Sequence, residues 1–248
     1  MATLAAPTAA EAQSAERKFY SRMALFMTAV IFVGFMPSFY LRGMVHYPRP
    51  NPSLPPHVMV HGLVFSAWLL IFIVQTQLVA AGRRDLHMML GALSFVIALA
   101  LVPLMYLTAV WQVARQNAPP FTDPLDWTIV PLSGIIPFAL MLWIGWTSRR
   151  EAQWHKRAML VAMLMIMQPG IGRFPIGPPS LLIHAIGGIL TLALFIPLIL
   201  WDRKTIGELH PVTSLGVSLT ALVIIIQVGV LATNVWAPIA AHLPGVPS

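Results

Sequence analysis

Histidine is the residue type with which this chain could do chemistry, and its histidines stand near the ends of long apolar stretches. The chain has no cysteine, so disulfides, thiolate metal sites and cysteine nucleophiles are excluded. A neutral imidazole can ligate haem iron or a metal ion such as zinc. The eight histidines are His46, His57, His61, His87, His155, His184, His210 and His242.

Two facing pairs of histidines could each hold a haem between neighbouring helices. If the apolar stretches alternate in direction, His61 and His184 share one end of the protein. His87 and His155 then share the other end. Ligation of haem b by such a pair is typical of a membrane redox or haem-binding protein. The alternative is that these amphipathic rings gather at a membrane interface and ligate nothing.

A second set of residues, all at one end, could instead hold zinc. Three imidazoles and one carboxylate, with room for a water molecule, are typical of a metal-dependent hydrolase. Each member also has a simpler explanation: Asp202 could pair with a neighbouring basic residue, and His210 could begin a helix. Asp85 could orient an imidazole, or could simply cap a helix. The proposed ligands are His87, His155, His210 and Asp202.

No carboxylate or lysine lies in the middle of an apolar stretch. Proton pumps and ion-coupled carriers usually place an acid at mid-membrane, so this distribution argues against both classes. The lack of a lysine there also excludes a retinal Schiff base. The carboxylates lie in tails, loops or segment ends, and they are Glu11, Glu16, Asp85, Asp123, Asp126, Glu151, Asp202 and Glu208.

The composition shows that lipid is the solvent for most of the chain. Of its 248 residues, 58% are hydrophobic and only 9% are charged, whereas a soluble domain carries about 25% charged residues. No polar stretch is long enough to form a separate soluble domain. The net charge of +7 lies mainly in short loops, which favours contacts with anionic lipid headgroups and not with nucleic acid.

Seven apolar stretches can cross the hydrocarbon layer as helices, which takes about 20 residues each. We therefore predict an all-α bundle of seven transmembrane helices at 23–236. A disordered tail at 1–22 precedes it, and a short outside tail at 237–248 follows it. The predicted spans are 23–41, 58–80, 86–111, 127–146, 154–168, 181–201 and 211–235.

Capping signals place several of these helix ends. Asp123 followed by Pro124 is typical of a helix start, and Gly82 is typical of a helix end. The sequence from Ser148 to Glu151 has the form of a capping box, which predicts an early start for the short fifth helix.

A polar stripe runs along the second predicted helix. His61, Trp68 and Gln75 are spaced by seven residues, so they lie on nearly the same side of a helix. Polar side chains on a membrane helix favour the interior of the bundle. We therefore expect this stripe to face other helices and not lipid.

Lysine and arginine are distributed unequally over the two predicted faces of the membrane. One face carries 11 of the 15 basic residues, and the richer face is expected to be cytoplasmic. The distribution predicts a cytoplasmic N-terminus, an outside C-terminus and location in a bacterial inner membrane. The basic residues on the other face are Arg42, Arg49, Arg115 and Arg173.

Short polar motifs recur at the span ends in a fixed order: His61-x6-Trp68-x6-Gln75, Arg84-Asp85-Leu86-His87, His155-Lys156-Arg157-x-Met159-Leu160 and His210-Pro211-x-Thr213. This pattern resembles a family of uncharacterised bacterial multi-span membrane proteins, over the second to the seventh span. The family implies no activity. The layout is also loosely similar to cytochrome b561-type membrane proteins and to seven-span membrane hydrolases with a cytoplasmic zinc site.

Three functions remain open from the sequence. The first is a small haem-binding or redox protein of the membrane, and the second is a metal-dependent hydrolase with a cytoplasm-facing site. The third is a non-catalytic protein without a cofactor, which serves as a partner or assembly subunit of another membrane protein. Bound haem separates the first from the others, and bound zinc separates the second.

Overall fold

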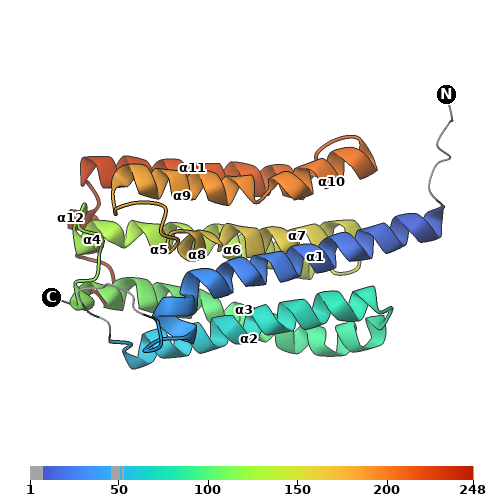
Figure 1. Cartoon of the computed structure of the whole chain (residues 1–248), viewed down its shortest axis with the longest axis horizontal. Helices are drawn as coiled ribbons and strands as arrows, with labels where there is room; N and C mark the ends of the chain where they lie inside the picture. Colours follow the sequence, from blue (N-terminus) through green and yellow to red (C-terminus); the bar gives the residue numbers. More distant parts are fainter. Residues whose placement is uncertain (1–7, 46–50, 52, 248) are drawn as a thin grey trace.

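The chain is helical throughout the part that the structure describes. The computed structural model describes residues 8–45, 51 and 53–247, and these contain no β-strand beyond an isolated bridge between Arg42 and Val45. The all-α prediction is therefore confirmed (Figure 1). His46 and Arg49 lie outside the described residues. The elements are α1 (Ala9–Phe35), η1 (Met36–Tyr40), α2 (Pro56–Ala80), α3 (Arg84–Trp111), η2 (Gln112–Arg115), α4 (Pro124–Trp127), α5 (Ile129–Ser133), α6 (Ile135–Thr147), α7 (Ala152–Met165), α8 (Gln168–Ile171), α9 (Leu181–Ala193), α10 (Ile196–Ile206), α11 (Pro211–Thr233) and α12 (Ala237–Ala240).

Six helical segments of the described chain have the length and composition needed to cross a membrane. This set indicates a multi-pass membrane protein, as the sequence predicts. The remaining predicted span corresponds to α7 and α8, and α7 has only 14 residues. The count of seven spans and their orientation stay predictions. The six segments are Ala9–Tyr40, Pro56–Ala80, Arg84–Arg115, Pro124–Thr147, Leu181–Ile206 and Pro211–Thr233.

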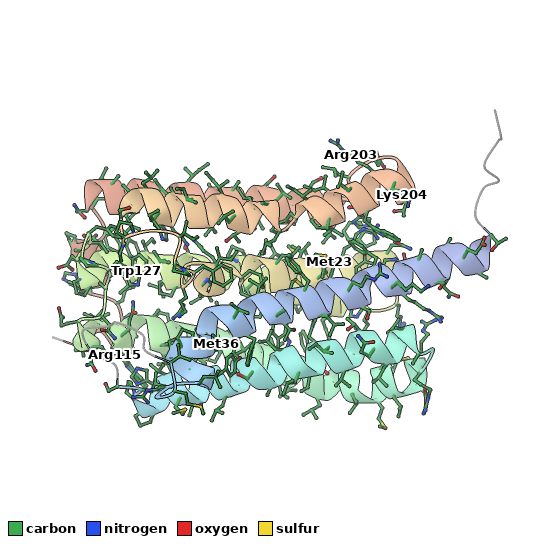
Figure 2. The ribbon with its side chains drawn as sticks, viewed as in Figure 1. Met23, Met36, Arg115, Trp127, Arg203 and Lys204 are labelled. Carbon is green, nitrogen blue, oxygen red and sulfur yellow. The ribbon has the colours of Figure 1, made fainter. Side chains whose placement is uncertain are left out.

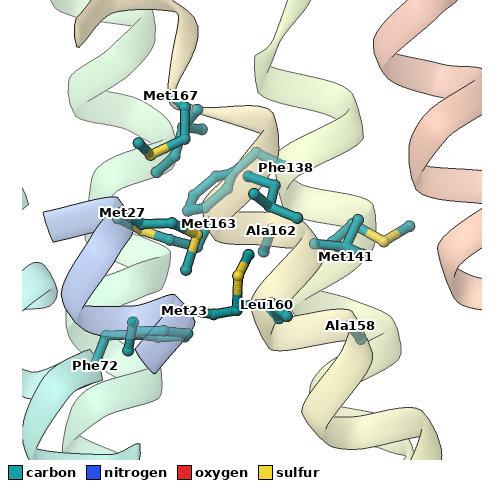
Figure 3. Packing of buried hydrophobic residues seen from close by; sticks show 14 of the residues in the cluster. Met23, Met27, Phe72, Phe138, Met141, Ala158, Leu160, Ala162, Met163 and Met167 are labelled. Carbon is teal, nitrogen blue, oxygen red and sulfur yellow. The ribbon is translucent and has the colours of Figure 1, made fainter. Parts of the chain in front are cut away.

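The short helix α7 lies in the interior of the bundle, in contact with α1, α6 and α11. Its side chains at 160–164 are all buried, with exposed fractions of 0–1%. A helix buried on every side is an internal helix and does not present one face to lipid. Figure 3 shows the core around it, where Met23 and Met27 of α1 lie close to Met163 of α7. The unbranched methionine side chains suit the irregular spaces between these helices.

The two ends of the bundle differ in charge, and we name them the basic end and the opposite end. The basic end contains the turns α2–α3, α6–α7 and α10–α11, and Figure 2 labels Arg203 and Lys204 there. The opposite end contains Arg115 and Trp127 (Figure 2). The helix α1 begins at the basic end, and α11 finishes at the opposite end (Figure 1). The basic residues of the three turns are Arg83, Arg84, Arg149, Arg150, Arg203 and Lys204.

The expected disordered tail at 1–22 is wrong over its described part, because α1 begins at Ala9. Thr8 and Glu11 form a capping box, in which the Thr8 hydroxyl accepts from the Glu11 N–H and the Glu11 carboxylate accepts from the Thr8 N–H. The capping box satisfies N–H groups that a helix start otherwise leaves without partners. The alanines and charged residues that follow favour helix, so the helix extends well before the apolar stretch.

The predicted end of α2 and the predicted start of α4 are confirmed, whereas two other predicted helix starts are wrong. Gly82 ends α2 with a left-handed backbone (φ +76°), and the Asp123 carboxylate caps α4 by accepting from the Leu125 N–H. Asp85 lies within the first turn of α3 and pairs with Arg83 instead of capping the helix. Ser148 starts no helix, because its hydroxyl bonds the preceding turn and α7 begins only at Ala152.

The tail predicted to lie outside, at 237–248, is packed against the opposite end over its described part. The buried Asp126 carboxylate accepts the N–H groups of Trp236 and Ala237, at 3.0 and 2.7 Å, and so caps α12. The indole of Trp236 donates to the Thr128 hydroxyl. Tyr106 of α3 donates to the carbonyl of Pro244 at 2.9 Å. These bonds hold the C-terminal residues to α3 and α4.

The backbones of α1 and α8 approach each other closely at Gly34 and Gly170. A Cβ atom on Gly34 would lie 2.2 Å from the Gly170 carbonyl oxygen, which is far inside the contact distance. Glycine at this position therefore lets the two helices touch. The neighbouring Ile31 side chain fills the space beside Gly170.

We predict that Gly34→Ala lowers the free energy of unfolding by about 1–3 kcal/mol, the usual cost of overpacking a core. Thermal unfolding of the purified protein in mild detergent measures this loss. Gly229→Ala is the matched control, because a Cβ there meets nothing within 4 Å. The control should leave the unfolding temperature unchanged or raise it, since alanine favours helix over glycine. Equal losses in both variants would contradict the close contact.

Candidate functional site

The structure brings together one of the predicted histidine pairs, His87 and His155. His87 lies in the first turn of α3, and His155 lies in the first turn of α7. Their ring centroids are 6.1 Å apart and the rings are nearly perpendicular, at 76°. The turn that Gly82 forms sets the start of α3, and the α6–α7 turn sets the start of α7. We name this pair the histidine site.

The orientation of the His155 ring is set by a backbone carbonyl. Its Nδ1 lies 2.7 Å from the carbonyl oxygen of Gly145 in α6. A carbonyl can only accept, so Nδ1 must carry a proton, and in the neutral ring Nε2 then carries the lone pair. A ligating histidine is commonly oriented in this way, through its other nitrogen. Gly145 itself is tightly enclosed, since a Cβ there would meet the Met159 sulfur at 2.7 Å.

Two polar side-chain atoms, one on the His87 ring and one on Gln75, lack a hydrogen-bond partner. The Nδ1 atom of His87 is buried and has no hydrogen-bond partner, and neither does the side-chain oxygen of Gln75. The Gln75 amide nitrogen donates to the Ser94 hydroxyl at 2.8 Å, and that hydroxyl donates to the Leu90 carbonyl. Buried polar atoms are usually satisfied. The two atoms are therefore able to bond a ligand or a water molecule.

The other two proposed zinc ligands belong to a separate network around Arg157. Asp202 is fully buried, and its Oδ1 lies 2.8 Å from the Arg157 guanidinium. Its Oδ2 accepts from the Thr213 hydroxyl at 2.6 Å and from the His210 N–H at 3.2 Å. The expected pairing of Asp202 with its basic neighbours in sequence is wrong. The carboxylate instead points into the bundle, toward the cation of α7.

His210 serves as the N-cap of α11. Its Nδ1 accepts from the Val212 N–H at 3.2 Å, and its ring lies edge-on to Trp154 at 5.0 Å. Burial lowers the pKa of His210, and the positive charge of Arg157 lowers it further. The ring is therefore neutral, which the capping bond requires. This arrangement matches the simpler explanation that the sequence offered.

The four proposed zinc ligands are thus divided between two places. His87 and His155 form the histidine site, whereas Asp202 and His210 bond to Arg157, Thr213 and Val212. Among the described residues, no group of three or more histidine, aspartate or glutamate side chains is placed to hold a metal ion. The structure therefore does not assemble the quartet, and zinc as a cofactor stays a prediction.

Like the zinc quartet, the second predicted haem pair, His61 and His184, is not brought together. His184 bonds Gln227 through Nε2 at 3.2 Å and lies edge-on to Trp127 of α4. His61 instead lies over Phe65 of its own helix, with a buried Nδ1 that has no partner. Each ring has different neighbours, so these two histidines do not form a facing pair. The prediction that the polar stripe of α2 faces other helices is confirmed for its other two members, because Trp68 and Gln75 are only 1% and 9% exposed.

Gln227 of α11 is a buried polar residue that the sequence analysis missed. Its amide nitrogen donates to the Val130 carbonyl and the Ser133 hydroxyl, and its oxygen accepts from Gln168 at 2.7 Å. The network therefore joins α5, α8, α9 and α11 near the opposite end. A single glutamine in an otherwise apolar stretch was the signal that could have revealed it.

Comparison with protein-family models finds no match for this chain, and neither curated proteins nor solved structures yield one. The family resemblance drawn from the polar motifs therefore stays a prediction. The geometry of the described residues carries the functional argument alone.

The buried ion pair between Arg157 and Asp202 leads to a stability prediction. We expect Asp202→Ala to lower the free energy of unfolding by about 3–5 kcal/mol, because it leaves the Arg157 charge buried without a partner. Thermal unfolding in mild detergent measures the loss. Asp85→Ala is the control, because its ion pair with Arg83 is exposed and exposed pairs contribute little. A loss for Asp202→Ala no larger than that of the control would contradict the network.

Proposed function

We propose that this chain is a seven-span protein of the bacterial inner membrane that binds one haem b at the histidine site. In this proposal His87 and His155 would hold the haem iron, and the protein is a small membrane redox or haem-binding protein. The observation that carries it is the 6.1 Å spacing of these two rings, one from α3 and one from α7. Haem held in this way transfers single electrons without any further catalytic residue.

The spacing of the rings supports the proposal. Imidazole nitrogens bind metal ions at ~2.0–2.1 Å, so two rings that hold the same ion would have centres no more than roughly 6 Å apart. The observed 6.1 Å agrees with this value. The ligands come from two different segments, so the site needs only the packing of α3 and α7 against α6.

The hydrogen bonding of the two rings at the histidine site also supports the haem proposal. The Gly145 carbonyl leaves the Nε2 lone pair of His155 free to bind iron. His87 has a buried Nδ1 without a partner, which a ligand or its water could satisfy. Arg84 is three residues before His87 on the same helix and could pair with a haem propionate. Ionised propionates would then lie toward the charged basic end and not in lipid.

The structure favours one haem over two. A second haem would need a facing pair at the opposite end, and His184 is already bonded to Gln227 there. The zinc hydrolase is less well supported, because Asp202 and His210 would first have to leave the Arg157 network. A protein that binds neither cofactor would be the non-catalytic membrane partner.

We predict that protein purified in mild detergent from haem-replete cells is coloured and has a sharp α-band after reduction. The pyridine haemochrome assay should find about one haem b per chain, as one pair of ligating histidines predicts. His87→Ala and His155→Ala should each abolish the band. His242→Ala is the matched control, because this exposed ring bonds only the nearby Pro238 carbonyl.

Two outcomes would overturn the haem proposal. One is a colourless wild-type protein, and the other is an α-band that survives both substitutions at the histidine site. Elemental analysis of the same samples tests the hydrolase alternative. About one zinc per chain, lost in His155→Ala and in His210→Ala, would favour that alternative.

The proposed topology places the N-terminus and the basic end in the cytoplasm. Its support is the excess of arginine and lysine in the three turns at that end. We predict that reporter fusions after Arg84, Arg150 and Lys204 report the cytoplasm. Fusions after Asn51, Asn117 and Gly177 should report the outside. Two consecutive fusions that report the same side would remove a span, and α7 is then the first segment to question.

A further inference from the structure

A polar groove lies between the first part of α1 and the end of α2, at the basic end. It is open to the surface and has a volume of ≈ 340 Å³. On α1 its lining residues recur every three or four positions, so they form one face of the helix. The polar residues that line it are Gln13, Ser14, Arg17, Lys18, Ser21 and Gln77.

The groove has two positive charges that no acid neutralises within the described chain. The ion pairs among the described residues are Arg83–Asp85, Lys156–Glu16 and Arg157–Asp202, and none includes Arg17 or Lys18. No carboxylate is among the residues that line the groove. Two cations beside hydroxyl and amide groups form a site that attracts an anion.

The floor of the groove is held by a bond between the two helices. The Gln77 amide donates to the Ser21 hydroxyl at 2.6 Å. Because this hydroxyl accepts from Gln77, its own hydrogen is available to a ligand oxygen. Ser14 lies about two turns earlier on the same face and adds a second hydroxyl.

The depth of the groove matches the headgroup layer of a membrane. Arg17 and Lys18 precede the apolar stretch that begins at Met23 by only ~8–9 Å along the helix. One turn after Ser21, on the same face, Leu25 is 49% exposed. On α2, Val74 lies one turn before Gln77 and is 45% exposed. An apolar surface thus continues from the groove toward the middle of the bundle.

We propose that this groove binds an anionic phospholipid, with the phosphate between Arg17, Lys18 and Ser21 and an acyl chain along Leu25 and Val74. Basic pockets between membrane helices on the cytoplasmic side commonly hold such headgroups. A soluble phosphate would use the same cations but not the apolar continuation. The site is separate from the histidine site, and its test does not depend on haem.

The test compares lipid binding of the purified full chain, in nanodiscs of phosphatidylcholine with or without phosphatidylglycerol. Native mass spectrometry should find phosphatidylglycerol retained in preference to phosphatidylcholine. The double variant Arg17→Gln, Lys18→Gln should bind it about tenfold less tightly or worse, since each basic residue contributes to attraction of anionic lipid. Ala80→Phe keeps the charge but fills the groove, and it should also lose the retained lipid.

The matched control is Arg22→Gln, Arg203→Gln. It removes the same charge from two exposed residues that do not line the groove, and it should retain phosphatidylglycerol. Equal losses in the two double variants would mean diffuse surface attraction and would overturn the site. Displacement of the lipid by inorganic phosphate, with phosphate bound in phosphatidylcholine discs, would also overturn it in favour of a soluble anion. Size-exclusion chromatography and thermal unfolding verify that each variant is folded.

Discussion

The buried ion pair between Arg157 and Asp202 is the interaction on which the arrangement of the bundle depends. The second half of the internal helix α7 is buried and apolar on nearly every side, so hydrophobic burial there does little to fix the rotation or depth of the helix. The ion pair fixes it against α10, and Thr213 extends the network to α11. Just beyond the C-terminal end of α7, Gln168 of α8 bonds Gln227 of α11. Polar bonds at both ends therefore position an internal helix that packing leaves undetermined.

The histidine site depends on the same interaction. His155 is two residues before Arg157, so whatever holds Arg157 also sets the height of the His155 ring. The bond to the Gly145 carbonyl then sets the direction of its free nitrogen. His87 arrives from a separate segment, through the tight turn at Gly82. The 6.1 Å spacing is thus the result of two independent positioning devices and not of a local sequence motif.

Features governed by nearby residues could be predicted from the sequence, and features governed by distant ones could not. The helical class, the buried stripe at Trp68 and Gln75, and the cap at Asp123 follow from composition, periodicity and local bonding. Arg157, inside the predicted fifth span, and Asp202, at the end of the sixth, are 45 residues apart, and their pairing was not predicted because a sequence does not show which helices touch. The start of α1 was missed because the capping box at Thr8 lies far outside the apolar stretch.

Two polar clusters near the basic end, one around Arg157 and one around His87, differ in whether their polar atoms have partners within the protein. Around Arg157, each carboxylate oxygen of Asp202 has a partner within the protein, so that network is complete without a ligand. Around His87, a ring nitrogen and the Gln75 oxygen remain open, and the Nε2 of His155 is left free by its carbonyl bond. An unsatisfied buried polar atom costs about 1–3 kcal/mol. A bound group or a water molecule would remove that cost at the His87 ring nitrogen, whereas the Asp202 carboxylate carries no such cost.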